Sequence, residues 1–281
     1  MSEGGRHILN LRMEGQRIWA EYDKKYPTDL SIRMYLGQGL EDWNPDTIDR
    51  IGCGGSETAS ALLSHELARQ NCQPLIYAMN NEIWDGVIYR KFSNFNPTSI
   101  PCHLFISSRV PTVFNDDIPA RQKWLWFHDI HRWDQFTPDI ASRIDVLVVL
   151  SKWHANFIKR VYPFMAEAEV IDMDNNPLTY DDTWTDQKWF ENETCYRLPK
   201  IAIIGNALNP ERFNGEEKRV PHRFIWCSSP DRGLLEVLEM WTALRKALPD
   251  ATLEIFYGWE YFDHTLAIAP YYREFKQKIR R

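Results

Sequence analysis

The chain has 281 residues, of which 44% are hydrophobic and 26% charged, with a formal net charge of -6 at pH 7. This composition excludes disordered and fibrous proteins, and the negative charge excludes a general attraction to nucleic acid or to anionic membranes. Five widely spaced cysteines form no C-x-x-C pair and favour reduced thiols over a disulfide framework. No apolar run approaches membrane-spanning length, so we predict a cytoplasmic globular protein without a transmembrane segment.

Residues 1–29 are polar and predict a helical lead-in. After them, short apolar runs alternate with helical patterns, which indicates right-handed βαβ units and a parallel sheet. We therefore expect an α/β, Rossmann-like domain over residues 30–209, with an irregular acidic insertion at about 166–198. Its predicted strands cover residues 30–36, 74–79, 103–107, 123–127, 145–150 and 200–205, and its predicted helices cover 57–70 and 151–161.

A second, smaller unit is expected in residues 210–281. It contains a strand at 223–227, the turn SSPDRG, a helix from Leu234 to about Leu248 and a strand at 252–258. One βαβ unit cannot cover both faces of its own sheet. We therefore expect an incomplete Rossmann-like domain, cut short or completed by another element.

The run IGCGGSETASALLSHELARQ, residues 51–70, places small residues in front of a helix on which Leu63 and Leu67 recur at helical spacing. Gly54 and Gly55 allow a ligand to approach the main chain, and a helix start favours an anion. The alternative is a tight turn that only lets the helix pack against a strand. On the first interpretation, a phosphate or carboxylate binds at this helix entrance.

The run KWLWFHDIHRWDQF, residues 123–136, ends a buried strand with His128 and Asp129. Open α/β sheets bind ligands at the carboxyl ends of their strands, so His128 is a candidate hydrogen-bond partner of a substrate hydroxyl or phosphate. The alternative is a core histidine satisfied by Asp129 or by backbone. His131 lies three residues further on, but no third ligand follows at suitable spacing, so we expect no metal.

The turn between the strand at 223–227 and the following helix contains Ser228, Ser229 and Arg232. Hydroxyls and a permanently charged guanidinium beside a helix start suit a phosphate, whereas the alternative is an N-cap with a solvent-facing arginine. A D-x-D at Asp172 and Asp174 leaves a manganese-dependent sugar transferase as a further alternative. No Walker loop, G-x-S-x-G elbow or H-E-x-x-H motif occurs, which disfavours NTPases, serine hydrolases and zincins.

Over residues 30–258 the sequence resembles a family 4 retaining glycosyltransferase of the GT-B fold. The matching segments, in the order of the family, are GGSETASALLSHELA, WFHD, VVLSKWH, IIGNALNPERF, SSPDRGL and PDATLEIFYG. In the second domain Arg232 stands near the position of the family's lysine, and serines fill the place of its arginine. Ala207 replaces a glycine, and the family's Glu-x7-Glu pair is missing.

The resemblance implies a hexosyltransferase of glycan biosynthesis that transfers sugar from a UDP- or GDP-sugar to a glycan or glycoconjugate, with retention of configuration. It implies no metal or other cofactor and no nucleic acid partner, and it is compatible with peripheral membrane contact. The implied roles are catalysis by His128 and Asp129, donor and phosphate binding by Gly54, Gly55, Ser228, Ser229 and Arg232, and lining of the cleft by Ser151 and Asn206. The alternative function is a non-catalytic acceptor-side or nucleotide-binding module that lacks the donor half.

Overall fold

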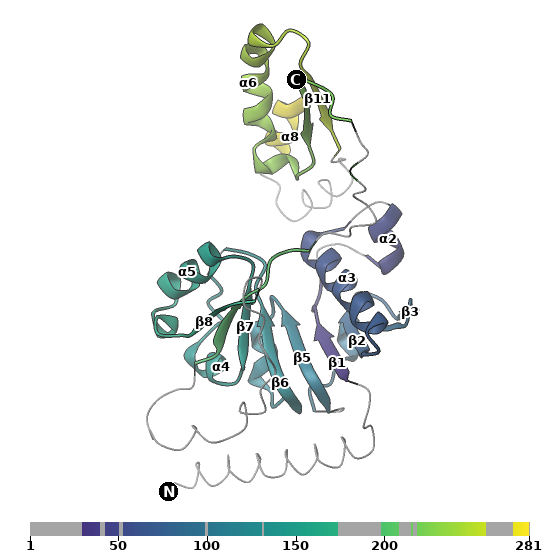
Figure 1. The fold of residues 1–281 in the computed structure, drawn as a ribbon, viewed down its shortest axis with the longest axis vertical. Helices are drawn as coiled ribbons and strands as arrows, with labels where there is room; N and C mark the ends of the chain where they lie inside the picture. Colours follow the sequence, from purple (N-terminus) through teal and green to yellow (C-terminus); the bar gives the residue numbers. More distant parts are fainter. Residues whose placement is uncertain are drawn as a thin grey trace, which may run out of the picture. The chain divides into compact units, whose positions relative to one another are not determined.

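A computed structural model of the chain describes residues 30–39, 43–50, 53–98, 101–130, 132–173, 198–207, 215, 218–256 and 272–280. The chain divides into two compact units, residues 1–207 and 208–281. Both units contain helices and parallel strands, which confirms the α/β class (Figure 1). The predicted lead-in at 1–29 and the part of the predicted insertion at 174–197 lie outside the described residues.

The first unit is built on a nine-stranded sheet of order β3-β4-β2-β1-β5-β6-β7-β9-β8. Neighbouring strands run parallel except for the β3–β4 pair. The strands are β1 Ser31–Tyr35, β2 Gln73–Ala78, β3 Glu82–Trp84, β4 Val87–Lys91, β5 Cys102–Ser108, β6 Ala120–Trp126, β7 Val146–Val149, β8 Val170–Asp172 and β9 Lys200–Ile203. All the strands predicted for this domain are therefore confirmed, as β1, β2, β5, β6, β7 and β9.

Helices cover both faces of this sheet. Successive residues of a strand point to opposite faces, and in β7 Leu147 and Val149 belong to one core cluster while Val146 and Val148 belong to another. The helices of the unit are α2 Pro45–Arg50, α3 Gly55–Arg69, α4 Pro138–Ser142 and α5 Lys152–Val161. Helices α4 and α5 contribute to the first cluster and α3 to the second, which explains why the strand is apolar throughout.

Helix α3 packs on the sheet with its small side chains more deeply buried than its leucines. Ser60 and Ser64 are fully buried, whereas Leu63 and Leu67 are only partly buried. The Ser64 hydroxyl donates to the carbonyl of Ser60 at 2.6 Å and lies 3.1 Å from the sulfur of Met34 in β1. The small residues therefore allow a close approach of helix and strand that the apolar spacing did not predict.

Two parts of the sheet were not predicted. Strands β3 and β4 form a hairpin through Asp85 and Gly86, which have φ angles of 45° and 79°. Strand β8 lies inside the stretch predicted as an irregular insertion and pairs with β9. The insertion prediction is therefore wrong for residues 170–172, because three residues without any period suffice to extend a sheet when the neighbouring strand supplies the partner.

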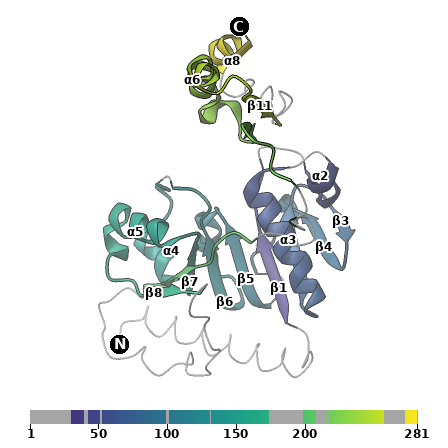
Figure 2. The ribbon, with the colours of Figure 1, turned by 45° about the horizontal axis from the view of Figure 1, so that its top comes forward.

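The second unit contains the predicted strand, helix and strand as β10 Arg223–Trp226, α6 Leu234–Ala247 and β11 Thr252–Ile255, followed by α8 Tyr272–Arg280. Strands β10 and β11 pair in parallel. The ring of Phe224 meets that of Trp241 edge-on, with centroids 5.9 Å apart. Helix α8 lies beside α6 in both views (Figures 1 and 2), and Leu238 and Ile279 line one hollow. The helical spacing predicts one buried face of this helix, but of its members only Leu234 is fully buried; the others are Leu235, Leu238, Trp241, Leu244 and Leu248.

Candidate functional site

The strand order gives the first unit a switch point between β1 and β5, which are neighbours at the centre of the sheet (Figure 2). From β1 the chain continues to β2 and β4 on one side, and from β5 it continues to β6, β7 and β9 on the other. Loops part at such a point, and open α/β sheets bind ligands there, beyond the carboxyl ends of their strands. We therefore take the side chains at this edge as the candidate site.

Two oppositely charged residues meet at the switch point. Glu57 lies in the first turn of α3, and Arg109 directly follows β5. The Nη2 of Arg109 donates to Oε1 of Glu57 at 2.6 Å, and the two side chains are 31% and 14% exposed. Arg109 has a φ of 64°, in the left-handed region that few non-glycine residues adopt, and its amide donates to the carbonyl of Trp126 at 3.0 Å. The backbone thus holds this guanidinium at the switch point.

Arg109 also connects this pair to the residues at the end of β6. Its Nη1 lies 3.7 Å from Oδ2 of Asp129. We define the switch-point network as Glu57, Arg109, His128 and Asp129. In the sequence Glu57 only favours the first turn of a helix, and neither Arg109 nor its pairing with Glu57 was predicted. The available signal was an arginine placed directly after the buried strand HLFISS.

His128 is a neutral member of the network. Burial is the main cause that lowers the pKa of His128, to about 4. The positive charge of Arg109 lowers this pKa further, whereas the carboxylates of Asp129 and Glu57 act to raise it. The His128 ring packs against Trp126 with centroids 4.3 Å apart. Its Nε2 atom is buried without a hydrogen bond among the described residues. At neutral pH the uncharged ring of His128 is therefore suited to donate one hydrogen bond and accept another. Asp129 makes no hydrogen bond to Nε2, so the alternative of a histidine satisfied by Asp129 is not supported at Nε2.

His154 and Ser151 support the network from α5. Ser151 caps the helix, since its Oγ accepts from the backbone N–H of His154 at 3.1 Å. The His154 ring is 2% exposed, and its Nδ1 accepts from the amide of Leu150 at 3.4 Å. Burial lowers the pKa of His154, while a backbone group and the carboxylate of Asp129 act to raise it. His154 thus lies close to Asp129. Ser151 caps α5, and its predicted role in lining the cleft stays a prediction.

Gly54 and Gly55 stand at the start of α3, as N-cap and first helical residue. Neither has a positive φ. A Cβ on Gly54 would collide with Oε2 of Glu57 and would lie 3.1 Å from its Cδ, whereas a Cβ on Gly55 would meet nothing within 4 Å. A side chain at position 54 would therefore require the Glu57 carboxylate to shift. This carboxylate lies beside the start of α3, where the sequence led us to expect a ligand anion.

The other predicted site residues lie apart from this network. Asn206 is exposed, after β9 in the first unit. In the second unit, the Ser229 hydroxyl donates to Asp231 Oδ1, and the carbonyl of Ser228 accepts from the indole N–H of Trp226 at 2.7 Å.

Helix α6 begins without a side-chain cap, at a glycine with a φ of 108°. The side-chain N-cap of that alternative is therefore wrong for α6, whereas its solvent-facing arginine agrees with the exposure of Arg232. Arg232 is exposed, at the end of the 3-10 turn η6 Pro230–Arg232.

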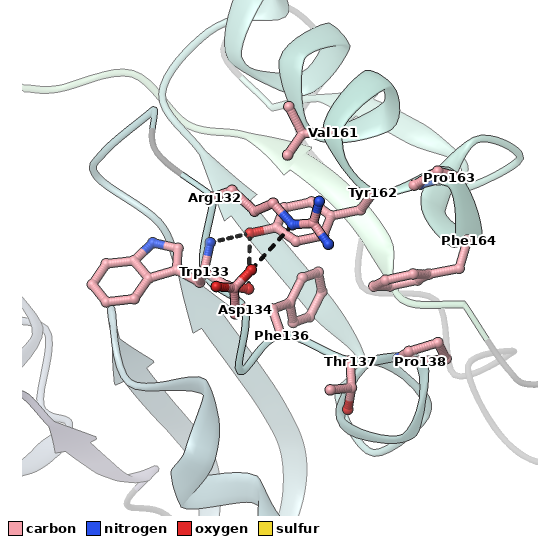
Figure 3. Close-up of a pocket in the computed structure, with 10 residues that line it drawn as sticks. All are labelled: Arg132, Trp133, Asp134, Phe136, Thr137, Pro138, Val161, Tyr162, Pro163 and Phe164. Atoms are coloured by element: carbon pink, nitrogen blue, oxygen red, sulfur yellow. Dashed lines mark hydrogen bonds and ion pairs between the residues drawn. The ribbon is translucent and has the colours of Figure 1, made fainter.

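A separate cavity of about 260 Å³ lies between the β6–α4 connection and the end of α5 (Figure 3). It is lined by Arg132, Trp133, Asp134, Phe136, Thr137, Pro138, Val161, Tyr162, Pro163 and Phe164. The Tyr162 hydroxyl accepts from the backbone N–H of Trp133 at 2.6 Å and donates to its carbonyl at 3.3 Å. Because this hydroxyl serves the backbone of the connection and no network residue lines the cavity, we assign the cavity a structural role.

Three further observations bear on ligands and partners. Within the part of the chain that the structure describes, no three His, Cys, Asp or Glu side chains are grouped to hold a metal ion. Asp172 pairs with Lys152 at 3.0 Å, whereas Asp174 and His131 lie outside the described residues. None of the helices described here has the length and apolar character needed to cross a membrane. Neither a family model nor a curated protein matches the sequence of this chain.

Proposed function

We propose that this chain is a cytoplasmic nucleotide-sugar glycosyltransferase, or most of one, that transfers a hexose from a UDP- or GDP-sugar to a glycan or glycoconjugate with retention of configuration. The observation that carries the proposal is the switch-point network, in which Arg109 connects Glu57 and Asp129 at the edge where Rossmann-like sheets bind their ligands. The resemblance to family 4 supplies the reaction, and the network supplies groups suited to hold a sugar.

The proposed chemistry needs little from the protein beyond positioning and charge. A nucleoside diphosphate is a good leaving group, so positive donors at its phosphates contribute more than a strong general acid. Arg232 suits this role, because it is exposed and stands at a strand-to-helix turn. A neutral His128 and the carboxylate of Asp129 suit sugar hydroxyls, whose correct placement lowers the barrier further. No metal takes part in the proposed transfer.

Thermal unfolding of residues 1–281 with a panel of UDP-, GDP- and ADP-sugars tests the proposal, because a ligand that binds only the folded chain raises the midpoint. We expect a shift with the sugars of one base. A cooperative transition that no nucleotide sugar moves would contradict the proposal and favour the alternative of a non-catalytic acceptor-side module.

Arg232→Ala sharpens this test. The side chain is exposed, so we expect an unchanged midpoint without ligand and a strongly reduced shift with the donor. Lys246→Ala is the matched control, because it removes one positive charge from an exposed position at the end of α6. Equal donor shifts in the two variants would rule out the role of Arg232.

A further inference from the structure

The switch-point network carries more negative than positive charge. Glu57 and Asp129 are carboxylates, and Arg109 is the only lysine or arginine among the described residues that pairs with either of them. Its guanidinium is already engaged, at 2.6 Å from Glu57 and 3.7 Å from Asp129. His128 adds no positive charge at neutral pH, because its pKa lies near 4. A phosphate bound here would therefore lie beside two carboxylates and beside a guanidinium that already pairs with both of them.

The start of α3 is likewise occupied by a group of the chain itself. The Glu57 carboxylate lies against Gly54 and accepts from the hydroxyl of Ser56 at 2.7 Å. A phosphate bound at this helix start would displace Glu57 from Arg109. The displaced carboxylate, whose side chain is only 14% exposed, would then lose its ion partner, and an unpaired carboxylate in a partly buried place is costly.

We infer that the switch-point network binds an uncharged, hydroxyl-bearing ligand and rejects phosphate. This inference rests on the proposed function, within which the ligand is the carbohydrate part of the acceptor. Sugar hydroxyls donate to carboxylate oxygens at Glu57 and Asp129 without disturbing the pair with Arg109. A hydroxyl both donates and accepts, so it also suits the buried Nε2 of His128 in either tautomer.

Side-chain NMR of the chain labelled with ¹⁵N-histidine tests the inference, with His128→Gln used only to assign the His128 signals. The neutral probes are methyl α-glucoside, methyl α-mannoside and maltose, and the anionic probes are inorganic phosphate and glucose 1-phosphate. We expect saturable shifts of the His128 signals with at least one neutral probe and none with inorganic phosphate. Shifts with inorganic phosphate, or no response to any neutral probe, would overturn the inference.

Glu57→Gln tests the electrostatic cause. Removal of this carboxylate charge frees Arg109 for an anion, so we expect inorganic phosphate to bind more tightly by on the order of tenfold. Glu66→Gln is the matched control, since it removes the same charge at the exposed far end of α3 and should leave phosphate binding unchanged. Asp129→Asn serves as a second variant if Glu57→Gln fails to fold. Phosphate binding that neither Glu57→Gln nor Asp129→Asn improves would contradict the proposed cause.

The two proposals fail separately. The donor shift depends on Arg232 in the second unit and is measured with nucleotide sugars, whereas the sugar response is measured at His128 in the first unit. Neutral-sugar binding without any donor shift would overturn the transferase and leave this inference standing. A donor shift together with phosphate binding at His128 would overturn only the inference.

Discussion

Arg109 donates to Glu57 at 2.6 Å and so ties the residue after β5 to the first turn of α3. The two residues are 52 positions apart in the chain, yet their partly buried ion pair lies at the place where the strand order reverses. This pair is therefore both a fold contact and the centre of the candidate site, and variants must separate the two roles.

We expect Arg109→Gln to destabilise the first unit, by about 1–3 kcal/mol, because it leaves a largely buried carboxylate without its ion partner. Glu57→Gln in the same chain should recover part of that loss. Urea unfolding of the single and double variants measures the coupling. The exposed pair of Asp139 and Arg143, at 3.1 Å, is the control, and its removal should change the free energy of unfolding by less than about 1 kcal/mol. Additive effects at Glu57 and Arg109 would contradict the coupling.

Gly54→Ala should lower the free energy of unfolding, whereas Gly55→Ala should leave it unchanged or raise it, although the two residues are neighbours. The Cβ added at position 54 forces the Glu57 carboxylate away from its place, whereas the Cβ added at position 55 meets open space. Gly55→Ala should be neutral or stabilising by about 0.5–1 kcal/mol, as alanine is favoured over glycine in a helix.

The loss from Gly54→Ala should shrink in a Glu57→Ala background, because the carboxylate that collides with the new methyl group is then absent. Thermal unfolding of Gly54→Ala, Gly55→Ala, Glu57→Ala and the double variant Gly54→Ala/Glu57→Ala gives the comparison. A loss at position 54 that persists without Glu57 would point to a backbone cause instead.

Acidification should weaken the fold partly through His128. The folded pKa near 4 lies below the ordinary value of 6.5, so the unfolded chain binds more protons between these values. The stability that His128 contributes is complete above the unfolded pKa and is lost as the pH falls towards the folded one.

Between about pH 7 and about pH 5 the loss through His128 amounts to about 2 kcal/mol. His128→Gln should therefore lose less stability than the parent chain over this range, as measured by urea unfolding. The pKa of His154 is also lowered, but this residue is present in both chains and its contribution cancels from the difference. Parallel pH profiles would show that His128 titrates normally.

Ser151→Ala should cost about 1 kcal/mol through loss of the cap of α5. The Ser151 hydroxyl accepts from the backbone N–H of His154 at 3.1 Å, and aspartate at this position retains such an acceptor. Ser151→Asp should therefore keep the melting temperature near that of the parent. If Ser151→Asp instead loses as much stability as Ser151→Ala, the hydroxyl contributes something other than a cap.

The alternation of apolar strands with helical patterns was sufficient to predict the centre of the sheet, because strands buried on both faces leave a continuous apolar run such as DVLVVL. The β3–β4 hairpin was missed although its signal was present. Asp85 and Gly86 form an Asp-Gly turn between two short apolar runs, which is a strong local sign of a hairpin. Strand β8 carried no such sign, since its pairing with β9 is a tertiary contact.

The candidate site was predicted in part. His128 and Asp129 were found because they end an apolar strand, a position that can be read along the chain. The pairing of Arg109 with Glu57 could not be read in this way, because it depends on the strand order, which places β5 beside β1. The packing of α3 through Ser60 and Ser64 was missed for a related reason, since the distance between helix and sheet sets which side chains fit.

The two outermost strands of the described sheet, β3 and β8, are each three residues long. A free sheet edge presents unpaired N–H and C=O groups on which another chain adds a strand, and this is how many β-rich proteins begin to aggregate. Short edges offer too few of these groups for a stable addition, even though Ile83 on β3 is 71% exposed. The described sheet thus ends on both sides in strands too short to pair stably with an added chain, so the brevity of its edge strands limits edge-to-edge aggregation.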